Sequence, residues 1–383
     1  MLTLQEVVQL DRDNRDALVL SAYLTRVDAD PARRAARRTR LDAEISRIRH
    51  SLGDAPRVER TAFDGAVAHM HQVLGDLTAD GSPLVAFVTE HGPLFAGRAL
   101  APVAAVVRWG RGVLLAPYMR SLKHEHPVLV VAVDSKHARL YRFLGGEVSL
   151  VETFEAPVSD HPPEHMGDVA RPRFHAGVRG TTGTDEALRR EGVAFDRMAG
   201  QLIRRMESER GREPWIVVGG MPSSVREVLS ALPRQLEARS ASVSALSPLS
   251  TLPEVALVAS VAASELTARR DEAWVESVFE HASGHGRSVC GTEDVRRALE
   301  ARSAHLLLVS ASLVDSDPSH ADRLVREALD GGTAVEVVSG AGAARLDADS
   351  EGVAAQLRYV PAENAAKTGP LGVLTESVGE TLS

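Results

Sequence analysis

The sequence predicts a protein of three domains, each built from both helices and β-strands. Its 383 residues are more than one hydrophobic core usually organises. Short apolar runs with strand-like character alternate along the chain with longer segments of helical periodicity, which is typical of α/β folds. Hydrophobic residues make up 44% of the chain and charged residues 25%, as in ordinary globular proteins. We therefore expect domains at 1–124, 125–270 and 271–383.

The first domain is expected to be α+β. Residues 18–27 alternate in polarity and are rich in strand-forming residues. Asp30 and Pro31 suit the N-cap and the first position of a helix over 31–52, and a second amphipathic helix is expected over 57–78. Three further strands, separated by Gly and Pro, are expected at 84–90, 94–100 and 112–118.

The second domain begins with three short strands within 127–156, because the turn sequences Asp134-Ser135-Lys136 and Gly145-Gly146 interrupt a strand-like run. A loop over 157–183 follows, and its length is unusual inside a compact domain. The elements expected after the loop are a helix over 184–209, a buried strand at 215–220, and helices over 222–232 and 255–268.

The third domain repeats this alternation of helices and strands. Its expected elements are helices over 271–284, 291–301 and 319–331, and strands over 305–313, 333–340 and 353–360. Gly331 and Gly332 provide the signal that ends the third of these helices. The order again indicates an α/β fold.

Composition excludes several classes of protein. The formal net charge of −8 argues against a protein that coats nucleic acid generally, although it leaves room for local basic patches. Arginine accounts for 41 of the 44 basic residues, which codon bias can explain, so only the position of an arginine indicates a role. The single cysteine, Cys290, excludes an internal disulfide and a cysteine-based zinc site. Because neither a membrane-spanning run nor a secretion signal is evident, we expect a cytoplasmic protein without membrane contact.

The loop sequence RPRFHAGVRGTTG (171–183) has the chemistry of an RNA contact. Its glycines let the backbone approach a phosphate, its arginines neutralise phosphate charge, and its aromatic side chains can stack on an unpaired base. The candidate RNA-binding residues of the loop are Arg171, Arg173, Phe174, His175, Gly177, Arg179, Gly180, Thr181, Thr182 and Gly183. The alternative is a solvated loop that binds nothing.

A second candidate RNA contact is the arginine-rich segment 31–50. Arg33, Arg37 and Arg40 fall near one face of the expected helix, where they could follow an RNA backbone. A solvated helix face is the commoner use of such a charge run, and that alternative stays open.

Catalytic, metal and cofactor motifs are weaker. His161-Pro-Pro-Glu-His165, with His175, lacks the regular helical turn that a zinc site of this spacing needs, so no metal is expected. Ser223 or a neighbouring group is expected to cap the helix over 222–232, and SGAGAARLD (339–347) lacks the following helix and acidic residue of a dinucleotide site. Neither a nucleophile elbow nor a Walker A sequence is present, and no cofactor is expected.

Two stretches resemble a known family. VLVVAVDSKHARLYRFLGGEV (128–148) resembles the opening of the middle domain of archaeal and eukaryotic peptide-chain release factors and their Pelota relatives. Residues 321–360 resemble the C-terminal domain of those proteins, and the order of the elements in between agrees. The overall pattern is similar to the bacterial branch of this superfamily, which includes the Balon-like ribosome hibernation factors. The resemblance covers about residues 125–360.

The resemblance implies both a fold and a role. The fold would have an RNase H-like middle domain and a three-layer α/β C-terminal domain related to RNA-binding ribosomal proteins. The role would be binding near the ribosomal A site as a hibernation, stress or rescue factor. The implied partners are ribosomal RNA, P-site tRNA and the elongation factor that delivers aminoacyl-tRNA.

The sequence departs from release factors at the residues that act in them. Release factors carry Gly-Gly-Gln in the middle-domain loop, whereas no glutamine occurs here between Gln72 and Gln201. The motifs that read stop codons are also missing from the first domain. Catalysis is therefore not favoured. The alternative is a peptidyl-tRNA hydrolase that uses Thr181, Thr182 or His175, and a scaffold that never binds ribosomes is a third possibility.

Overall fold

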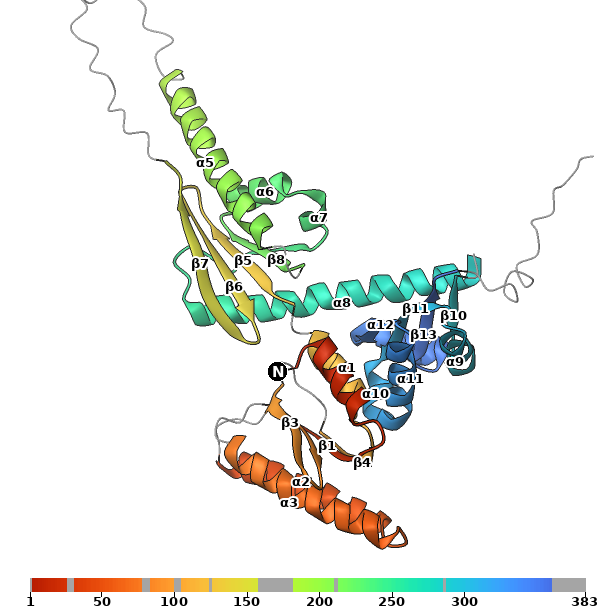
Figure 1. The fold of residues 1–383 in the computed structure, drawn as a ribbon. Coiled ribbons are helices and arrows are strands. Elements are labelled where there is room, and N and C mark those ends of the chain that lie inside the picture. Colours follow the sequence, from red (N-terminus) through yellow and green to blue (C-terminus); the bar gives the residue numbers. More distant parts are fainter. Residues whose placement is uncertain are drawn as a thin grey trace, which may run out of the picture. The chain divides into compact units, whose positions relative to one another are not determined.

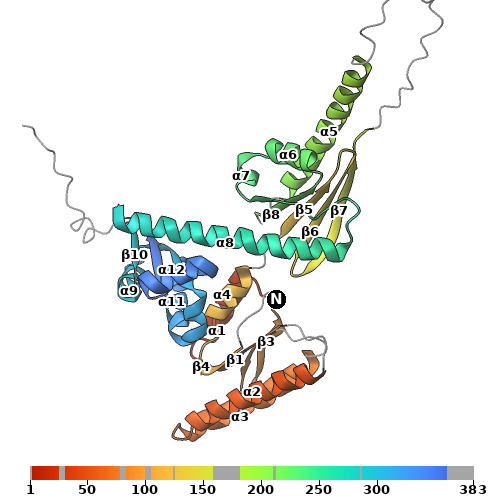
Figure 2. The ribbon, with the colours of Figure 1, turned by 180° about the vertical axis from the view of Figure 1, so that it is seen from behind.

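The computed structural model describes residues 2–25, 31–77, 83–99, 105–123, 126–157, 182–209, 213–284 and 287–359. These residues form three β-sheets with helices packed on them, so the chain has the mixed α/β fold that its sequence predicts (Figures 1 and 2). The chain divides into two compact units. The larger unit is Met1–Lys123 with Arg270–Ser383, and the middle unit is His124–Arg269. The division into three domains stays a prediction.

The first sheet of the larger unit is antiparallel, with the strand order β3-β2-β1-β4. Its strands are β1 (Leu18–Leu24), β2 (Leu84–Thr89), β3 (Gly92–Arg98) and β4 (Val106–Arg111). Helices α2 (Pro31–Ser51) and α3 (Arg57–Leu77) cover one face, where they form a core with Leu20, Ala22 and Leu24 of β1. Val19 and Tyr23 are buried on the opposite face, so β1 is apolar on both sides.

The structure differs from the prediction on either side of this sheet. Helix α1 (Leu4–Asp13) is not apparent in the sequence pattern, and it begins with a capping box made by Thr3 and Glu6. The strand predicted at 112–118 is wrong, because helix α4 (Ala116–Leu122) occupies the second half of that segment. The preceding residues 113–115 are buried in the core without forming a strand. A short apolar run cannot by itself distinguish these cases.

The second sheet of the larger unit has the strand order β10-β13-β11-β12, with β11 and β12 parallel and the other neighbours antiparallel. Its strands are β10 (Ser288–Cys290), β11 (Ala304–Ser310), β12 (Ala334–Val338) and β13 (Val353–Leu357). The helices of this region are α9 (Thr292–Glu300), α10 (Ala311–Ser316), α11 (Pro318–Asp330) and α12 (Gly340–Ser350).

Three expectations for the chain after residue 250 are wrong. The helices predicted over 255–268 and 271–284 form one helix, α8 (Leu252–Gly284), because neither Gly nor Pro occurs between Glu254 and Ser283. The strand predicted at 305–313 ends at Ser310, whose hydroxyl accepts a hydrogen bond from the Leu313 amide and caps α10. A helix, α12, does occupy most of the segment SGAGAARLD.

The middle unit holds a sheet with the strand order β7-β6-β5-β8-β9. Strands β5 (Val128–Val133), β6 (His137–Leu144) and β7 (Glu147–Glu155) form an antiparallel meander, and β8 (Trp215–Gly220) and β9 (Ser240–Val243) run parallel to β5. Helices α5 (Thr182–Ser208), α6 (Pro222–Ala231) and α7 (Arg234–Glu237) pack on one face, and the first part of α8 packs on the other. The strands and helices predicted from 127 to 232 are confirmed.

The turn from β8 into α6 requires glycine. Gly220 has a φ of +137°, and a Cβ atom built there would lie 1.8 Å from the carbonyl oxygen of Val133. Pro222 opens the helix, so the N-cap is Met221, whose side chain makes no capping hydrogen bond. The cap expected from Ser223 is therefore wrong.

Asp322 of α11 joins the two sheets of the larger unit. Its side chain is 2% exposed, and its Oδ1 accepts hydrogen bonds from the backbone amides of Leu115 at 2.5 Å and Ala116 at 3.3 Å. Arg108 Nη1 and Arg326 Nη2 each lie 3.0 Å from its Oδ2. Because Arg108 belongs to β4 and Asp322 to α11, this buried carboxylate ties the N-terminal and C-terminal parts of the larger unit together.

A buried ion pair joins the two places where the chain leaves and re-enters the larger unit. Lys123 Nζ lies 2.5 Å from Asp271 Oδ1 and donates to the carbonyl oxygen of Val337 at 2.7 Å. Asp271 Oδ2 accepts a hydrogen bond from the backbone amide of Ser339 at 3.0 Å. The two charged side chains are 3% and 0% exposed, and burial lowers the pKa of Lys123 below its ordinary value.

Glu336 of β12 lies within the electrostatic reach of this pair. Desolvation raises the pKa of Glu336, against the opposing effects of Arg270 and Lys123, and the negative charge of Asp271 adds to the rise. The guanidinium of Arg270 lies 3.9 Å from the Glu336 carboxylate and stacks over the Trp274 ring at 4.5 Å.

Candidate functional site

Most of the predicted RNA-binding loop lies outside the described residues. This applies to Arg171, Arg173, Phe174, His175, Gly177, Arg179, Gly180 and Thr181, and also to His161 and His165. Thr182 and Gly183 open helix α5, but their side chains are outside the described part of the chain. The structure therefore describes the predicted RNA contacts of α2 alone.

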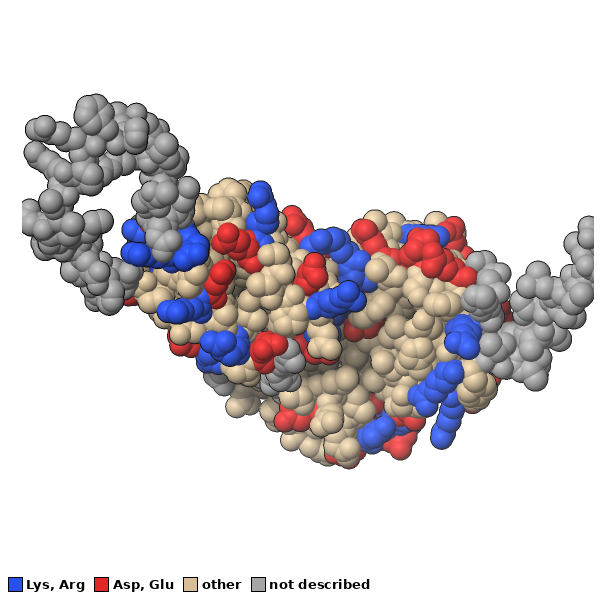
Figure 3. All heavy atoms as spheres, turned by 90° about the horizontal axis from the view of Figure 1, so that it is seen from above, with Lys and Arg blue, Asp and Glu red and all other residues tan. Residues whose placement is uncertain are grey.

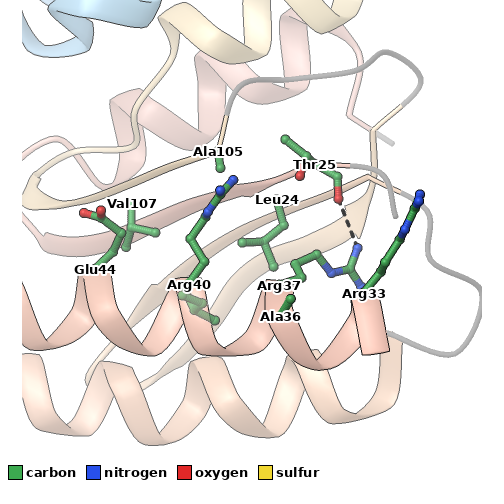
Figure 4. A pocket seen from close by; sticks show the side chains of 10 residues that line it. Leu24, Thr25, Arg33, Ala36, Arg37, Arg40, Glu44, Ala105 and Val107 are labelled. Atoms are coloured by element: carbon green, nitrogen blue, oxygen red, sulfur yellow. Dashed lines mark hydrogen bonds between the residues drawn. The ribbon is translucent and has the colours of Figure 1, made fainter. Parts of the chain in front are cut away.

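Arg33, Arg37 and Arg40 line one pocket of the larger unit (Figure 4). The pocket has a volume of about 270 Å³ and lies between the first half of α2, the end of β1 and the start of β4. Strand β4 is the edge of its sheet, so the pocket lies under α2 at the sheet margin. We call this space the arginine pocket.

The floor of the arginine pocket is apolar. It is formed by Leu24, Leu41 and Val107, which are 5%, 2% and 9% exposed, together with the small side chains of Ala36 and Ala105. Leu24, Leu41 and Val107 belong to the core between the first sheet and its helices. The floor is therefore part of a packed core, and its shape is fixed by the fold.

Arg37 is held in place at the wall of this pocket. The residue is 7% exposed, and its Nη1 donates a hydrogen bond to the carbonyl oxygen of Thr25 at 3.3 Å, as drawn in Figure 4. A buried guanidinium keeps its charge, because its pKa is too high for deprotonation in a protein. Arg37 therefore places a fixed positive charge beside the apolar floor.

Arg33 and Arg40 are exposed at the mouth of the pocket. Within the described part of the chain, Arg40 makes neither an ion pair nor a hydrogen bond through its side chain. Among the described residues of the lining, the one acidic side chain is that of Glu44, which lies 2.6 Å from Arg47 Nη2 and is thus paired with an arginine outside the pocket. The lining therefore carries three guanidinium groups and one carboxylate that is already neutralised.

The placement of these arginines does not favour the stability of α2. Residues 31–41 contain five arginines and no acidic residue, and the first turn of α2 has no acid. The helix dipole makes a cation in the first turn unfavourable by about 0.3–1 kcal/mol. Of the three arginines that line the pocket, only Arg33 lies in that turn, so the stability of α2 does not account for its position there.

The interpretation of the stripe as a solvated helix face does not hold for Arg37, which is buried. A signal for this was present in the sequence. Arg37 lies four, eight and eleven residues before Leu41, Ile45 and Ile48, so it shares their apolar face. Sequence reasoning also missed the pocket residues of β1 and β4, because nothing in the sequence brings those strands under the start of α2.

The surface charge is mixed on the face shown in Figure 3. There, Lys and Arg side chains are interspersed with Asp and Glu side chains over the described residues. Within the described ranges, no group of three or more His, Cys, Asp or Glu side chains could hold a metal ion. No described helix combines the length and the apolar character needed to cross a bilayer.

Comparison with known families identifies the central part of the chain. Residues 114–265 match the family described as "Bacterial archaeo-eukaryotic release factor family 10". This part of the chain is similar to that family of release factors. The release factor-like segment covers less than half of the 383 residues, and it includes the sheet of the middle unit but not the arginine pocket. No curated protein matches the chain.

Several solved structures match the chain. S. cerevisiae Dom34, described as a translation termination-like factor interacting with Hbs1, is 10% identical, with a TM-score of 0.42 over 63% of this chain and 66% of Dom34. Archaeoglobus fulgidus Pelota is 14% identical, with a TM-score of 0.38 over 73% and 80%. A ribosome-bound archaeal Pelota is 14% identical, with a TM-score of 0.42 over 94% of each chain. The chain thus spans just under two thirds of Dom34.

Proposed function

We propose that this protein binds the ribosome as a factor of the release-factor superfamily, with the arginine pocket as one of its RNA contacts. The observation that carries the proposal is the convergence of Arg33, Arg37 and Arg40 on one pocket, in which the one acid among the described lining residues, Glu44, is paired with Arg47. Arginine side chains are the usual means by which a protein neutralises RNA phosphates. The match of residues 114–265 to release factors supports the ribosome as the source of that RNA.

The proposed action is occupancy near the A site in hibernation, stress or rescue, without stop-codon reading. The absence of glutamine between Gln72 and Gln201 supports this, since the residue that release factors use for hydrolysis is missing. The proposed partners are ribosomal RNA, P-site tRNA and the elongation factor that delivers aminoacyl-tRNA, all in the cytoplasm. No described residue favours the alternative of a peptidyl-tRNA hydrolase.

Co-sedimentation with purified ribosomes across a salt series tests this function. The logarithm of the binding constant should fall linearly with the logarithm of the salt concentration, because phosphate contacts release counterions. Arg40→Gln should reduce the slope by about 0.7–0.9, the value for one lost phosphate contact. The matched control is Arg38→Gln, which removes an exposed arginine of the same helix outside the pocket. If wild-type protein stays in the supernatant at every salt concentration, the proposal is wrong.

A further inference from the structure

We propose that the arginine pocket takes up one unstacked nucleotide of single-stranded RNA, with the base on the apolar floor and its phosphate at Arg33 and Arg40. This inference rests on the proposed function and names the form of RNA that the pocket recognises. Nucleotides of this kind occur in loops and at the ends of folded RNA, where bases are free to leave the stack.

The size and lining of the pocket indicate the base. A bare phosphate needs charge alone, yet Leu24, Leu41 and Val107 present apolar surface that an ion would leave unfilled. The volume of about 270 Å³ lies just below the range of about 300–1,000 Å³ that holds drug-sized molecules. A nucleobase with its sugar is a ligand of that size with a flat apolar surface.

The arrangement of charge indicates the phosphate. Arg37 is buried in the wall beside the floor, whereas Arg33 and Arg40 are exposed at the mouth. A nucleotide can match this arrangement, with its phosphate at the mouth and the polar edge of its base toward Arg37. The exposed guanidinium groups can each bind a phosphate through two parallel hydrogen bonds.

The apolar floor disfavours an acidic peptide. An Asp or Glu side chain could pair with Arg37, but its short apolar part would leave most of the floor formed by Leu24, Leu41 and Val107 uncovered. Double-stranded RNA is disfavoured as well, because its bases are stacked inside the helix and only its backbone could reach the arginines.

The test compares two RNA probes that have the same number of phosphates. One is a labelled decamer of oligouridylate, whose bases stack weakly, and the other is the same sugar–phosphate chain without bases. Fluorescence anisotropy with the full chain gives a dissociation constant for each. We expect the base-containing decamer to bind roughly tenfold more tightly, since burial of about 60 Å² of apolar surface of the base contributes about that factor.

Two variants locate the base. Ala36→Phe fills the pocket without changing its charge, and it should bring the ratio of the two constants close to one while leaving binding of the abasic chain unaltered. Ala35→Phe is the matched control, because Ala35 is an exposed neighbour on α2 that does not line the pocket, and it should keep the tenfold ratio. Arg40→Gln should weaken binding of both probes.

The outcomes separate this inference from the proposed function. Equal binding of the two probes by wild-type protein, or an unchanged ratio in Ala36→Phe, overturns the nucleotide pocket even if the protein co-sediments with ribosomes. A ratio of the two dissociation constants close to one in both Ala36→Phe and Ala35→Phe also overturns it, because a phenylalanine outside the pocket would then have the same effect as one inside it. Failure of wild-type protein to co-sediment refutes the ribosomal function, whatever the ratio.

Discussion

Replacing Lys123 with methionine should destabilise the larger unit strongly. Methionine matches much of the volume of lysine but cannot donate a hydrogen bond. The variant therefore leaves Asp271, which is 0% exposed, as a buried anion whose remaining partner is the Ser339 amide at 3.0 Å. It also removes the donor that lies 2.7 Å from the carbonyl oxygen of Val337. Neither acceptor can turn to solvent, because the site is fully enclosed.

The expected cost is about 3–5 kcal/mol, which is the usual effect of removing one partner from a buried ion pair. With a urea m-value of about 2.5 kcal/mol/M, this loss lowers the unfolding midpoint by about 1–2 M.

Urea unfolding followed by tryptophan fluorescence measures the effect in the relevant unit. The chain has three tryptophans, and Trp215 is the one in the middle unit, while Trp109 and Trp274 lie in the larger unit. All variants should therefore carry Trp215→Phe, so that the signal reports the larger unit alone. Two units can unfold in separate transitions, and this design avoids mixing them.

A second substitution tests the cause. Asp271→Asn removes the orphaned charge but keeps an oxygen for the Ser339 amide, so the Lys123→Met, Asp271→Asn double variant should recover at least half of the lost stability. The reasoning is refuted if Lys123→Met costs less than about 1 kcal/mol, or if the double variant is no more stable than the single one.

Three further results are expected from the same kind of measurement. The pKa of Glu336 is raised above its ordinary value of 4.5, so the stability that this carboxyl contributes is fully present below pH 4.5 and is lost as the pH rises through the raised pKa. Urea titrations between pH 4 and pH 7 should therefore show Glu336→Gln gaining stability relative to wild type as the pH rises. Asp322→Ala should cost the larger unit about 3–5 kcal/mol, because two arginines and two backbone amides lose a buried carboxylate, and a change in urea midpoint below that of an exposed substitution would contradict this. Gly220→Ala should destabilise the middle unit by more than about 2 kcal/mol, because the added Cβ would overlap the Val133 carbonyl. The control is Gly192→Ala on helix α5, where the added Cβ meets nothing within 4 Å, and it should raise the thermal midpoint slightly.

The fold was predictable wherever one local signal determined an element. Pro31 marks the start of α2, and the turn at Gly145-Gly146 separates β6 from β7, because these residues restrict the backbone whatever surrounds them. The segment 112–118 could not be predicted correctly, since it is an apolar run whose conformation is decided by contacts with parts of the chain that lie far away in sequence. The continuity of α8 was open to prediction from the lack of any helix breaker.

The candidate site was only partly predictable for the same reason. Helical spacing brings Arg33, Arg37 and Arg40 to one side of α2, and that follows from the sequence. The pocket itself needs Leu24 and Val107, which pairing of β1 with β4 places beneath the helix. Pairing between strands separated by about 80 residues depends on the whole fold, so a single sequence gives no local sign of it.

The Lys123–Asp271 pair has a consequence for the construction of the chain. The polypeptide departs at Lys123 and returns at Arg270, and the 2.5 Å contact keeps those two points adjacent. The intervening 146 residues therefore form an inserted domain, and the two ends of the larger unit that flank the insertion are already in contact. A variant in which a few glycines replace the inserted domain should still fold into the larger unit with both of its sheets.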